Sequence, residues 1–320
     1  MLTLCYRSQS HCSAEDYNKP TSNDLTHHEV QIVKYVNELL SHGVRMYASG
    51  FLVETYTISL WYADRLGIVK SQKFNFLREP HYLLLMALAI VNARSAGFGF
   101  CSLFQNLPRD PTSYAGATFF LPQSLDVRGD SIGDLSFAID INKNRNLVTS
   151  YGAVGRGTTF VPVRVHHEHK EVLGLGNLVV KMSWQRVECR EDSHIRMIRT
   201  SLASSSDMAA RHALSFIVDM KYSSRLHLNN PLVALPRAFM KHLGVLAIED
   251  SRDLCCLILK EYLPLQQISS VDELKKVFRE VLTGSAPTTF LCCPSSLYRV
   301  RRASLGLGNR RHPTSQHQPA

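Results

Sequence analysis

Two segments in the middle of the chain decide the expected fold: residues 155–158 read Gly-Arg-Gly-Thr, and residues 178–184 read Leu-Val-Val-Lys-Met-Ser-Trp. Glycine has no Cβ atom, so a turn with Gly155 and Gly157 lets backbone N–H groups approach a phosphate closely. The apolar run around Lys181 is typical of a buried strand that carries the lysine into a cleft under the turn. Together the segments favour a phosphate pocket built on a sheet, although a GxG pair also occurs in ordinary turns and a lysine at a strand end often reaches solvent.

The composition limits which kinds of protein and partner are expected. With 320 residues, of which 45% are hydrophobic, the chain can form a sizeable core in about two domains. The net charge is +9, and the stretch after Glu280 carries five arginines and no acidic residue. A solvated basic tail explains this run better than a nucleic-acid interface, which needs a basic patch on a folded face. No nucleic-acid partner is therefore expected.

Cysteine usage and hydropathy indicate the compartment. The eight cysteines include no CxxC pair, which favours free thiols in a reducing compartment over zinc sites or disulfides. No signal peptide is visible, and the longest apolar run, 82–93, is shorter than the about 20 residues that a membrane span needs. We therefore expect an intracellular protein, cytoplasmic or nuclear, with no membrane partner.

Changes of pattern along the chain predict four parts. They are a disordered N-terminus, an N-terminal domain that ends in a loop-rich linker, a second domain and a disordered basic tail, over residues 1–25, 26–134, 135–283 and 284–320. The N-terminal domain has an α-β-β-α pattern, with elements expected over 26–41, 50–62, 68–76 and 81–96. Residues 64–67, Asp-Arg-Leu-Gly, have the chemistry of a hairpin turn between the two strand-like runs.

The second domain has the pattern of a sheet with helices. Strand-like runs are expected over 136–141, 160–165, 178–182, 244–248 and 254–260, and helices over 190–202 and 271–282. The segment 166–169, His-His-Glu-His, contains metal-ligand residue types. Neighbouring residues of an extended chain point to opposite sides, so a solvated loop is favoured there and no metal site is predicted.

The chain resembles the fungal-type protein kinases at these segments. The Gly-Arg-Gly-Thr turn and residues 180–184, Val-Lys-Met-Ser-Trp, are similar to the nucleotide lobe of that family. The N-terminal unit is similar to the family's own leader, through the helix at 35–42, the turn 64–67 and the phrase 72–76. The resemblance covers about residues 30–283, with gaps.

The resemblance implies an α+β fold. An N-terminal α-β-β-α leader domain would precede a kinase-like small lobe, which is an antiparallel sheet with one helix, and the large lobe would be mostly missing. It also implies ATP as the cofactor. The residues that would bind ATP lie in the phosphate loop, at the anchoring lysine and along the adenine hinge, and they are Gly155, Gly157, Thr158, Lys181, Glu261 and Leu263.

The carboxylate that would pair with Lys181 stays open between two positions. In the family it falls about thirteen residues after the lysine, where this chain has His194. Glu191, about one turn earlier, is the nearest substitute. A histidine supplies no permanent negative charge, so a lysine beside His194 would be poorly oriented for phosphate.

Other departures from the family pattern concern catalysis. A third loop glycine is absent, and Phe160 stands near its place. No His-Arg-Asp-x-x-x-x-Asn, Asp-Phe-Gly or Asp-Phe-Asp segment follows Lys181, so no catalytic residue and no Mg²⁺ ligand is predicted. The chain is thus expected to be a Ser/Thr phosphotransferase by resemblance but inactive as written, either truncated or from a gene model that reads past an exon boundary. The alternative is a non-catalytic pseudokinase fragment that binds another protein.

A small lobe without its large lobe would leave apolar surface uncovered. The helix expected over 271–282 carries Leu274, Val277, Phe278 and Val281. Large exposed apolar patches mark interaction sites in soluble proteins. We therefore expect a protein partner that covers the small lobe.

Overall fold

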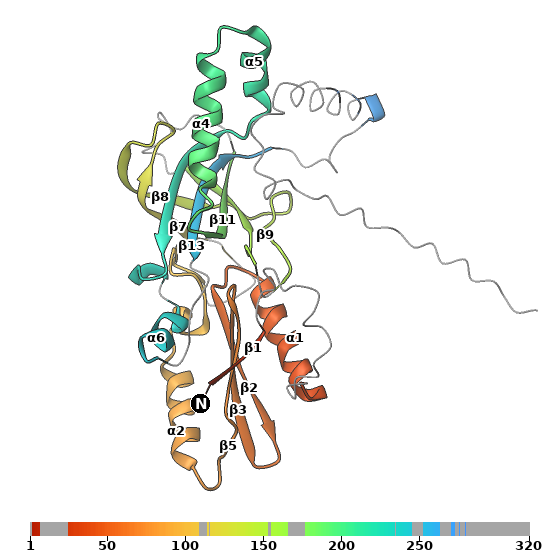
Figure 1. Cartoon of the computed structure of the whole chain (residues 1–320), viewed down its shortest axis with the longest axis vertical. Helices are drawn as coiled ribbons and strands as arrows, with labels where there is room; N and C mark the ends of the chain where they lie inside the picture. The colour runs from red at the N-terminus through yellow and green to blue at the C-terminus, as the bar shows by residue number, and fades with distance from the viewer. Residues whose placement is uncertain are drawn as a thin grey trace, which may run out of the picture. The chain divides into compact units, whose positions relative to one another are not determined.

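The computed structural model describes residues 2–6, 25–108, 114, 116–152, 155–165, 177–233, 235–244, 252–262, 270–272, 275 and 279. Its contacts divide the chain into two compact units, Met1–Ser269 and Ser270–Ala320. All helices and strands named below belong to the first unit, and Figure 1 labels most of them. The finer division predicted at residues 134 and 135 stays a prediction. The predicted tail and the segment 166–169 lie outside the described residues.

The first sheet is antiparallel and lies in the N-terminal part of the chain. Its strands have the order β1-β4-β3-β2, with β5 paired to β3. Their bounds are β1 Leu2–Tyr6, β2 Tyr47–Glu54, β3 Thr57–Asp64, β4 Gly67–Ser71 and β5 Phe74–Asn75. We call this sheet, together with the helices α1 (His27–Ser41) and α2 (Pro80–Asn92), the leader.

Helix α1 packs on the first sheet along one apolar face. Val36 and Leu40 of the helix form a buried cluster with Ala48, Trp61 and Ala63 of β2 and β3. Thr26 caps its N-terminus, because the Thr26 hydroxyl accepts from the N–H of Glu29 (3.3 Å) while the Glu29 carboxylate accepts from the N–H of Thr26 (3.0 Å). The predicted helix over 26–41 is thus confirmed.

Two expectations for the leader are wrong. The run 50–62 is not one strand, because a turn at Thr55 (φ 54°) and Tyr56 divides it into the hairpin of β2 and β3. Residues 2–6, which were expected to be disordered, form β1 and pair with β4. The turn at 64–67 is confirmed: it joins β3 to β4, and the Asp64 carboxylate accepts from the N–H groups of Leu66 (2.8 Å) and Gly67 (3.1 Å).

The second sheet closes into a barrel. Its strand order is β11-β13-β12-β7-β8-β10-β9, and the additional pairing of β10 with β11 closes the ring, while β6 pairs with β7. The bounds are β6 Phe104–Gln105, β7 Thr118–Leu125, β8 Ser131–Ile139, β9 Val148–Thr149, β10 Thr159–Val165, β11 Leu178–Arg186, β12 Met220–His227 and β13 Arg252–Lys260. Alternate side chains of these strands fill the interior, including Phe119, Phe137, Val161, Val180 and Leu254.

The sheet closes into a barrel, which the sequence did not predict, because β7 and β8 take part in it. The loop-rich linker expected at the end of the domain 26–134 instead contains β7 and the start of β8. Pro122 obscures β7, since proline is unusual inside a paired strand. In the structure Pro122 lies at a register shift between Leu121 and Ser124, beside Gln123 with a φ of 49°, so no ladder hydrogen bond from position 122 is required.

Short helices connect or cover the barrel strands. Helix α4 (Glu191–Ser204) packs on its outside, where Ile195 joins Cys255, Leu257 and Leu259 of β13 in a buried cluster. The other helices are α5 Met208–Ala213, α6 Pro236–His242 and the 3-10 turns η2 Ser95–Phe98, η4 Leu214–Phe216 and η5 Pro231–Val233. Neither α5 nor α6 was expected from the sequence. The predicted strand 244–248 and helix 271–282 lie largely outside the described residues. Among the residues that are described, no helix is both long enough and apolar enough to cross a membrane.

Candidate functional site

The site is built on the outer face of β11. Leu178, Val180, Met182 and Trp184 point into the barrel core. Side chains alternate along a strand, so the residues between them face outward, toward α4. Lys181 is one of these outward residues, and it lies between Phe160 of β10 and Leu257 of β13 in the sheet register. It is nevertheless buried, with 5% of its surface exposed.

A carboxylate of α4 neutralises the buried ammonium. Glu191, in the first turn of α4, forms an ion pair with Nζ of Lys181 through Oε1. Its other oxygen, Oε2, accepts from Nε2 of Gln185 at 2.7 Å. Gln185 also donates to the Ser183 hydroxyl (2.9 Å), and both of these side chains are 1% exposed. The Glu191 carboxylate is therefore fixed from two sides by groups of one strand.

This geometry decides between the two partners left open for the lysine. His194 lies one turn further along α4, and its side chain is exposed. Glu191 faces β11 and binds Lys181 directly. The ion pair thus spans ten residues in this chain, fewer than the family spacing given above, because α4 begins at Glu191, only a few residues after the end of β11.

The glycine turn lies between β9 and β10. Gly155 and Gly157 have φ angles of 119° and 51°, which disfavour residues with a side chain. A Cβ atom at Gly157 would lie 2.2 Å from Nε of Arg65, whereas one at Gly155 would meet nothing within 4 Å. Thr158 precedes β10, and its carbonyl accepts from the N–H of Ser150 at 2.8 Å.

Arg65 of the leader forms hydrogen bonds with this turn and with the segment before it. The Arg65 carbonyl accepts from the N–H of Gly155 (3.1 Å), and its guanidinium donates to the carbonyls of Gly152 and Leu40, the latter at 2.7 Å. Burial lowers the pKa of Arg65 to about 10, so the side chain still carries its charge at neutral pH. Further contacts join α1 to the segment between β9 and the turn, including a hydrogen bond from the hydroxyl of Tyr151 to Glu38 (3.0 Å).

The expected hinge residues are only partly described. The Glu261 carboxylate accepts from Nε of Arg145 at 2.8 Å, and its N–H donates to the carbonyl of Asn177 at 2.9 Å. The backbone N–H of Glu261 is therefore already engaged. Leu263 lies outside the described residues.

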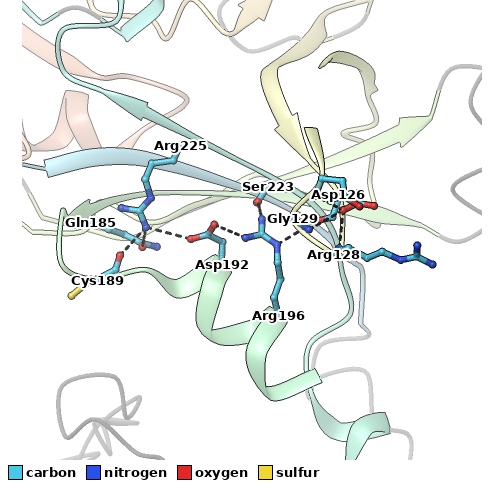
Figure 2. Close-up of polar contacts among 10 residues, drawn as sticks. Asp126, Arg128, Gly129, Gln185, Cys189, Asp192, Arg196, Ser223 and Arg225 are labelled. Atoms are coloured by element: carbon cyan, nitrogen blue, oxygen red, sulfur yellow. Dashed lines mark hydrogen bonds and ion pairs between the residues drawn. The ribbon is translucent and has the colours of Figure 1, made fainter. Parts of the chain in front are cut away.

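Sequence reasoning missed a set of charged side chains between α4 and β12. Asp192, next to Glu191, accepts from Arg196 of the same helix (3.0 Å) and from Arg225 of β12 (3.4 Å). Figure 2 shows these side chains in one layer between α4 and the strands. The one available signal is that Arg225 alternates with Tyr222 and Leu226 in the pattern of β12, but it does not identify the partner.

Of the four cysteines whose burial the structure describes, three are buried and Cys189 is partly exposed. Cys101, Cys189, Cys255 and Cys256 are free cysteines. Burial and, as a smaller cause, the charge of Asp192 together raise the pKa of Cys255 to about 12. Among the described residues, no group of three His, Cys, Asp or Glu side chains is placed to hold a metal ion.

Comparison with known proteins identifies a family. A family model described as fungal protein kinase matches residues 5–286. No curated protein and no solved structure matches the chain. The match includes the leader as well as the barrel, so both parts are covered by one family pattern.

Proposed function

The chain belongs to the fungal protein kinase family, and from this premise we propose that the barrel and α4 form a small lobe that binds ATP. The observation that carries this proposal is the buried ion pair between Lys181 and Glu191. In protein kinases a lysine of the third lobe strand and a glutamate of the lobe helix form this pair, and the lysine holds the α- and β-phosphates. Here the same two groups lie on β11 and on the helix that directly follows it.

The arrangement leaves the lysine able to bind phosphate. An ammonium has three N–H donors, and among the described residues Glu191 is the partner of Nζ. Glu191 holds the ammonium of Lys181 against the first turn of α4. The remaining N–H donors of Nζ are thus available for phosphate oxygens. Lys181 balances the charge of Glu191 whether or not phosphate is bound.

The glycine turn fits a phosphate loop at one position and is restricted at another. The open space at Gly155 lets the backbone approach a ligand closely. Its N–H group, however, donates to the carbonyl of Arg65. Phosphate would therefore bind through other N–H groups of the turn, or would compete with the leader for this one. When bound, ATP supplies the phosphoryl group, and the adenine would lie near the backbone of Glu261 and Leu263.

We further propose that these 320 residues bind ATP without transferring its phosphate. In the kinase template one aspartate accepts the proton of the substrate hydroxyl, and an aspartate and an asparagine hold the Mg²⁺ ions. The sequence contains no His-Arg-Asp or Asp-Phe-Gly segment after Lys181 that could supply them. The lysine and its carboxylate are thus one part of the phosphoryl-transfer machinery.

Thermal melting with ATP and Mg²⁺ tests the nucleotide site. At an ATP concentration of 100 times Kd, binding adds about 2.7 kcal/mol to the free energy of unfolding. For a unit of this size that is roughly 5–10 °C in Tm. Lys181→Met should remove the shift. Lys221→Met should keep it, because Lys221 belongs to β12 and pairs with Asp219 instead of Glu191. No shift of the unaltered chain at millimolar ATP would rule the site out.

One observation favours a second function, that of a protein-binding module. Helix α2 of the leader has no buried residue, although its sequence is strongly apolar. Leu84, Leu85 and Val91 are exposed by 61%, 60% and 81%. Exposed apolar surface of this kind marks interaction sites. Substituting these residues by Gln should reduce binding of a dye that reports apolar surface, without lowering Tm, and unchanged dye binding would argue against it.

A further inference from the structure

The charges behind α4 fix the part of the helix that carries Glu191. Arg196 contacts three elements at once: Nη1 donates to Asp192 of its own helix (3.0 Å), Nε to the carbonyl of Asp126 at the end of β7 (3.2 Å), and Nη2 to the Ser223 hydroxyl of β12. Figure 2 shows the Arg196 side chain in the centre of these partners. The fork geometry of a guanidinium allows this simultaneous contact, which a lysine could not reproduce.

Each acceptor of Arg196 is itself held in place. The Asp126 carboxylate accepts from the N–H groups of Arg128 (2.7 Å), Gly129 (2.9 Å) and Asp130 (2.9 Å), so the turn after β7 is closed by its own hydrogen bonds. Ser223 is 1% exposed and belongs to the barrel wall. The helix is therefore tied to a rigid turn and to a strand at fixed positions.

Arg225 holds the start of the helix from the same side. Its Nη2 donates to the carbonyl of Cys189 at 2.8 Å and contacts Asp192 at 3.4 Å. These contacts matter because α4 begins without a side-chain N-cap: Arg190, at that position, makes no capping hydrogen bond. An uncapped first turn frays easily, and Glu191 and Asp192 both lie in it. The buried carboxylate of Asp192, 7% exposed, replaces the missing cap as the anchor.

Glu191 and Asp192 are consecutive, so they leave the helix about 100° apart. One carboxylate reaches forward to Lys181 of β11, and the other reaches back to Arg196 and Arg225. The helix cannot rotate or move outward to separate Glu191 from Lys181 without also breaking the contacts of Asp192. The charges match in number, since Lys181, Arg196 and Arg225 face Glu191, Asp192 and Asp253.

We propose that Arg196 is a positioning residue, which holds α4 through Asp192, Ser223 and the turn 126–130 so that Glu191 binds Lys181 within the chain itself. No partner has to press the helix onto the barrel. The proposal deepens the ATP-binding function and rests on it for its consequence, which is a lysine ready for phosphate before nucleotide arrives. The pairing itself can be measured without nucleotide.

Trace acetylation of the full chain, read by mass spectrometry, tests the proposal. The labelling rate of Lys181 is measured against that of exposed Lys143 without ATP. Arg196→Met should raise the Lys181 rate about fivefold, because local opening of α4 exposes the amine and removes its carboxylate. Glu191→Gln should raise it similarly, and adding Arg196→Met to that variant should change it by less than about twofold, since the two residues act on one contact.

Arg128→Met is the matched control. It makes the same substitution in the turn 126–130, but the Arg128 side chain is exposed and points away from Arg196 in Figure 2. Its Lys181 rate should equal that of the unaltered chain. An unchanged Lys181 rate in a folded Arg196→Met chain would overturn the proposal. The proposal would also fail if Arg196→Met raised the Lys181 rate as much in the Glu191→Gln variant as in the unaltered chain.

A milder variant covers the case in which Arg196→Met does not fold. Ser223→Ala removes a single acceptor of Arg196 and keeps every charge. We expect about a twofold rise in the Lys181 rate with circular dichroism unchanged, and no rise would refute the proposal. A chain that shows these rates but no ATP-dependent Tm shift would refute the ATP site alone, because the labelling uses no nucleotide.

Discussion

Replacing Asp64 by Asn tests how the turn 64–67 holds the leader to helix α6. Asp64 is fully buried and forms an ion pair with Nε of Arg237 at 2.6 Å. Arg237, 3% exposed, also donates to the carbonyl of Gly67 at 3.0 Å. The Tyr62 hydroxyl donates to the same carboxylate at 2.7 Å. Asp64→Asn keeps the shape of the side chain and removes the only charge in this group that balances the guanidinium.

The expected loss follows from the burial of Arg237. Removing one partner of a buried ion pair leaves an uncompensated charge in the interior and costs about 3–5 kcal/mol. A typical domain has a free energy of unfolding of about 5–15 kcal/mol, so the variant should lose roughly a fifth or more of its stability. Urea denaturation, followed by tryptophan fluorescence because Trp61 and Trp184 are both buried, measures the loss directly.

Two further variants make the result specific. Adding Arg237→Met to Asp64→Asn removes both charges, and the double variant should be more stable than Asp64→Asn alone because a buried pair can often be replaced by apolar groups at little cost. Arg164→Met is the control, since Arg164 pairs with Asp140 while 66% of its side chain is exposed; it should change stability by less than about 0.5 kcal/mol. A loss below about 1 kcal/mol for Asp64→Asn, or additive losses in the double variant, would refute the reasoning.

Three other predictions concern the site, a helix cap and the thiols. Glu191→Gln should abolish the ATP-dependent rise in Tm while His194→Gln keeps it, and equal shifts in both variants would contradict the pairing seen here. Thr26→Ala should destabilise the chain by about 1 kcal/mol in urea denaturation, through loss of the capping box; an unchanged midpoint would show that the cap is dispensable. Because burial raises the pKa of Cys255 to about 12, the contribution of this thiol to the free energy of unfolding should be constant below about pH 9 and fall as pH rises toward 12, where the unfolded thiol ionises and the folded one does not. At pH 8.5 iodoacetamide should modify Cys189 before Cys255, and equally fast modification of Cys255 would contradict its burial.

The sequence predicted those elements that are stabilised by residues close together in the chain. The turn 64–67 follows from Asp64 and Gly67, whose side-chain oxygen and missing Cβ close a tight turn without help from the rest of the fold. Helix α1 follows from its apolar spacing and its cap. The strand that carries Lys181 follows from the apolar run in front of the lysine, which is typical of a buried strand.

The remaining features depend on contacts between distant residues. Barrel closure needs β7 to pair with β8 and β12, and the sequence of β7 gives little sign of a strand because of Pro122. The choice of Glu191 over His194 depends on where α4 begins, and helix starts are ambiguous when no capping residue marks them. The contacts of Arg196 join a turn, a helix and a strand, and each contributes one polar residue that is unremarkable by itself.

The leader and the proposed phosphate loop share one set of hydrogen bonds, and this links the N-terminal part of the chain to the site. The turn 64–67 contacts two parts of the chain. Asp64 binds Arg237 of α6, and Arg65 binds Gly155 of the glycine turn and Gly152 just before it. The side chain of Arg65 also occupies the space that a Cβ atom at Gly157 would need. The glycine at 157 is therefore required by the leader, whether or not a phosphate ever binds beside it. Of the two glycines that first suggested a nucleotide site, Gly155 alone has open space around it, so the case for ATP rests on the pair of Lys181 and Glu191 more than on the turn.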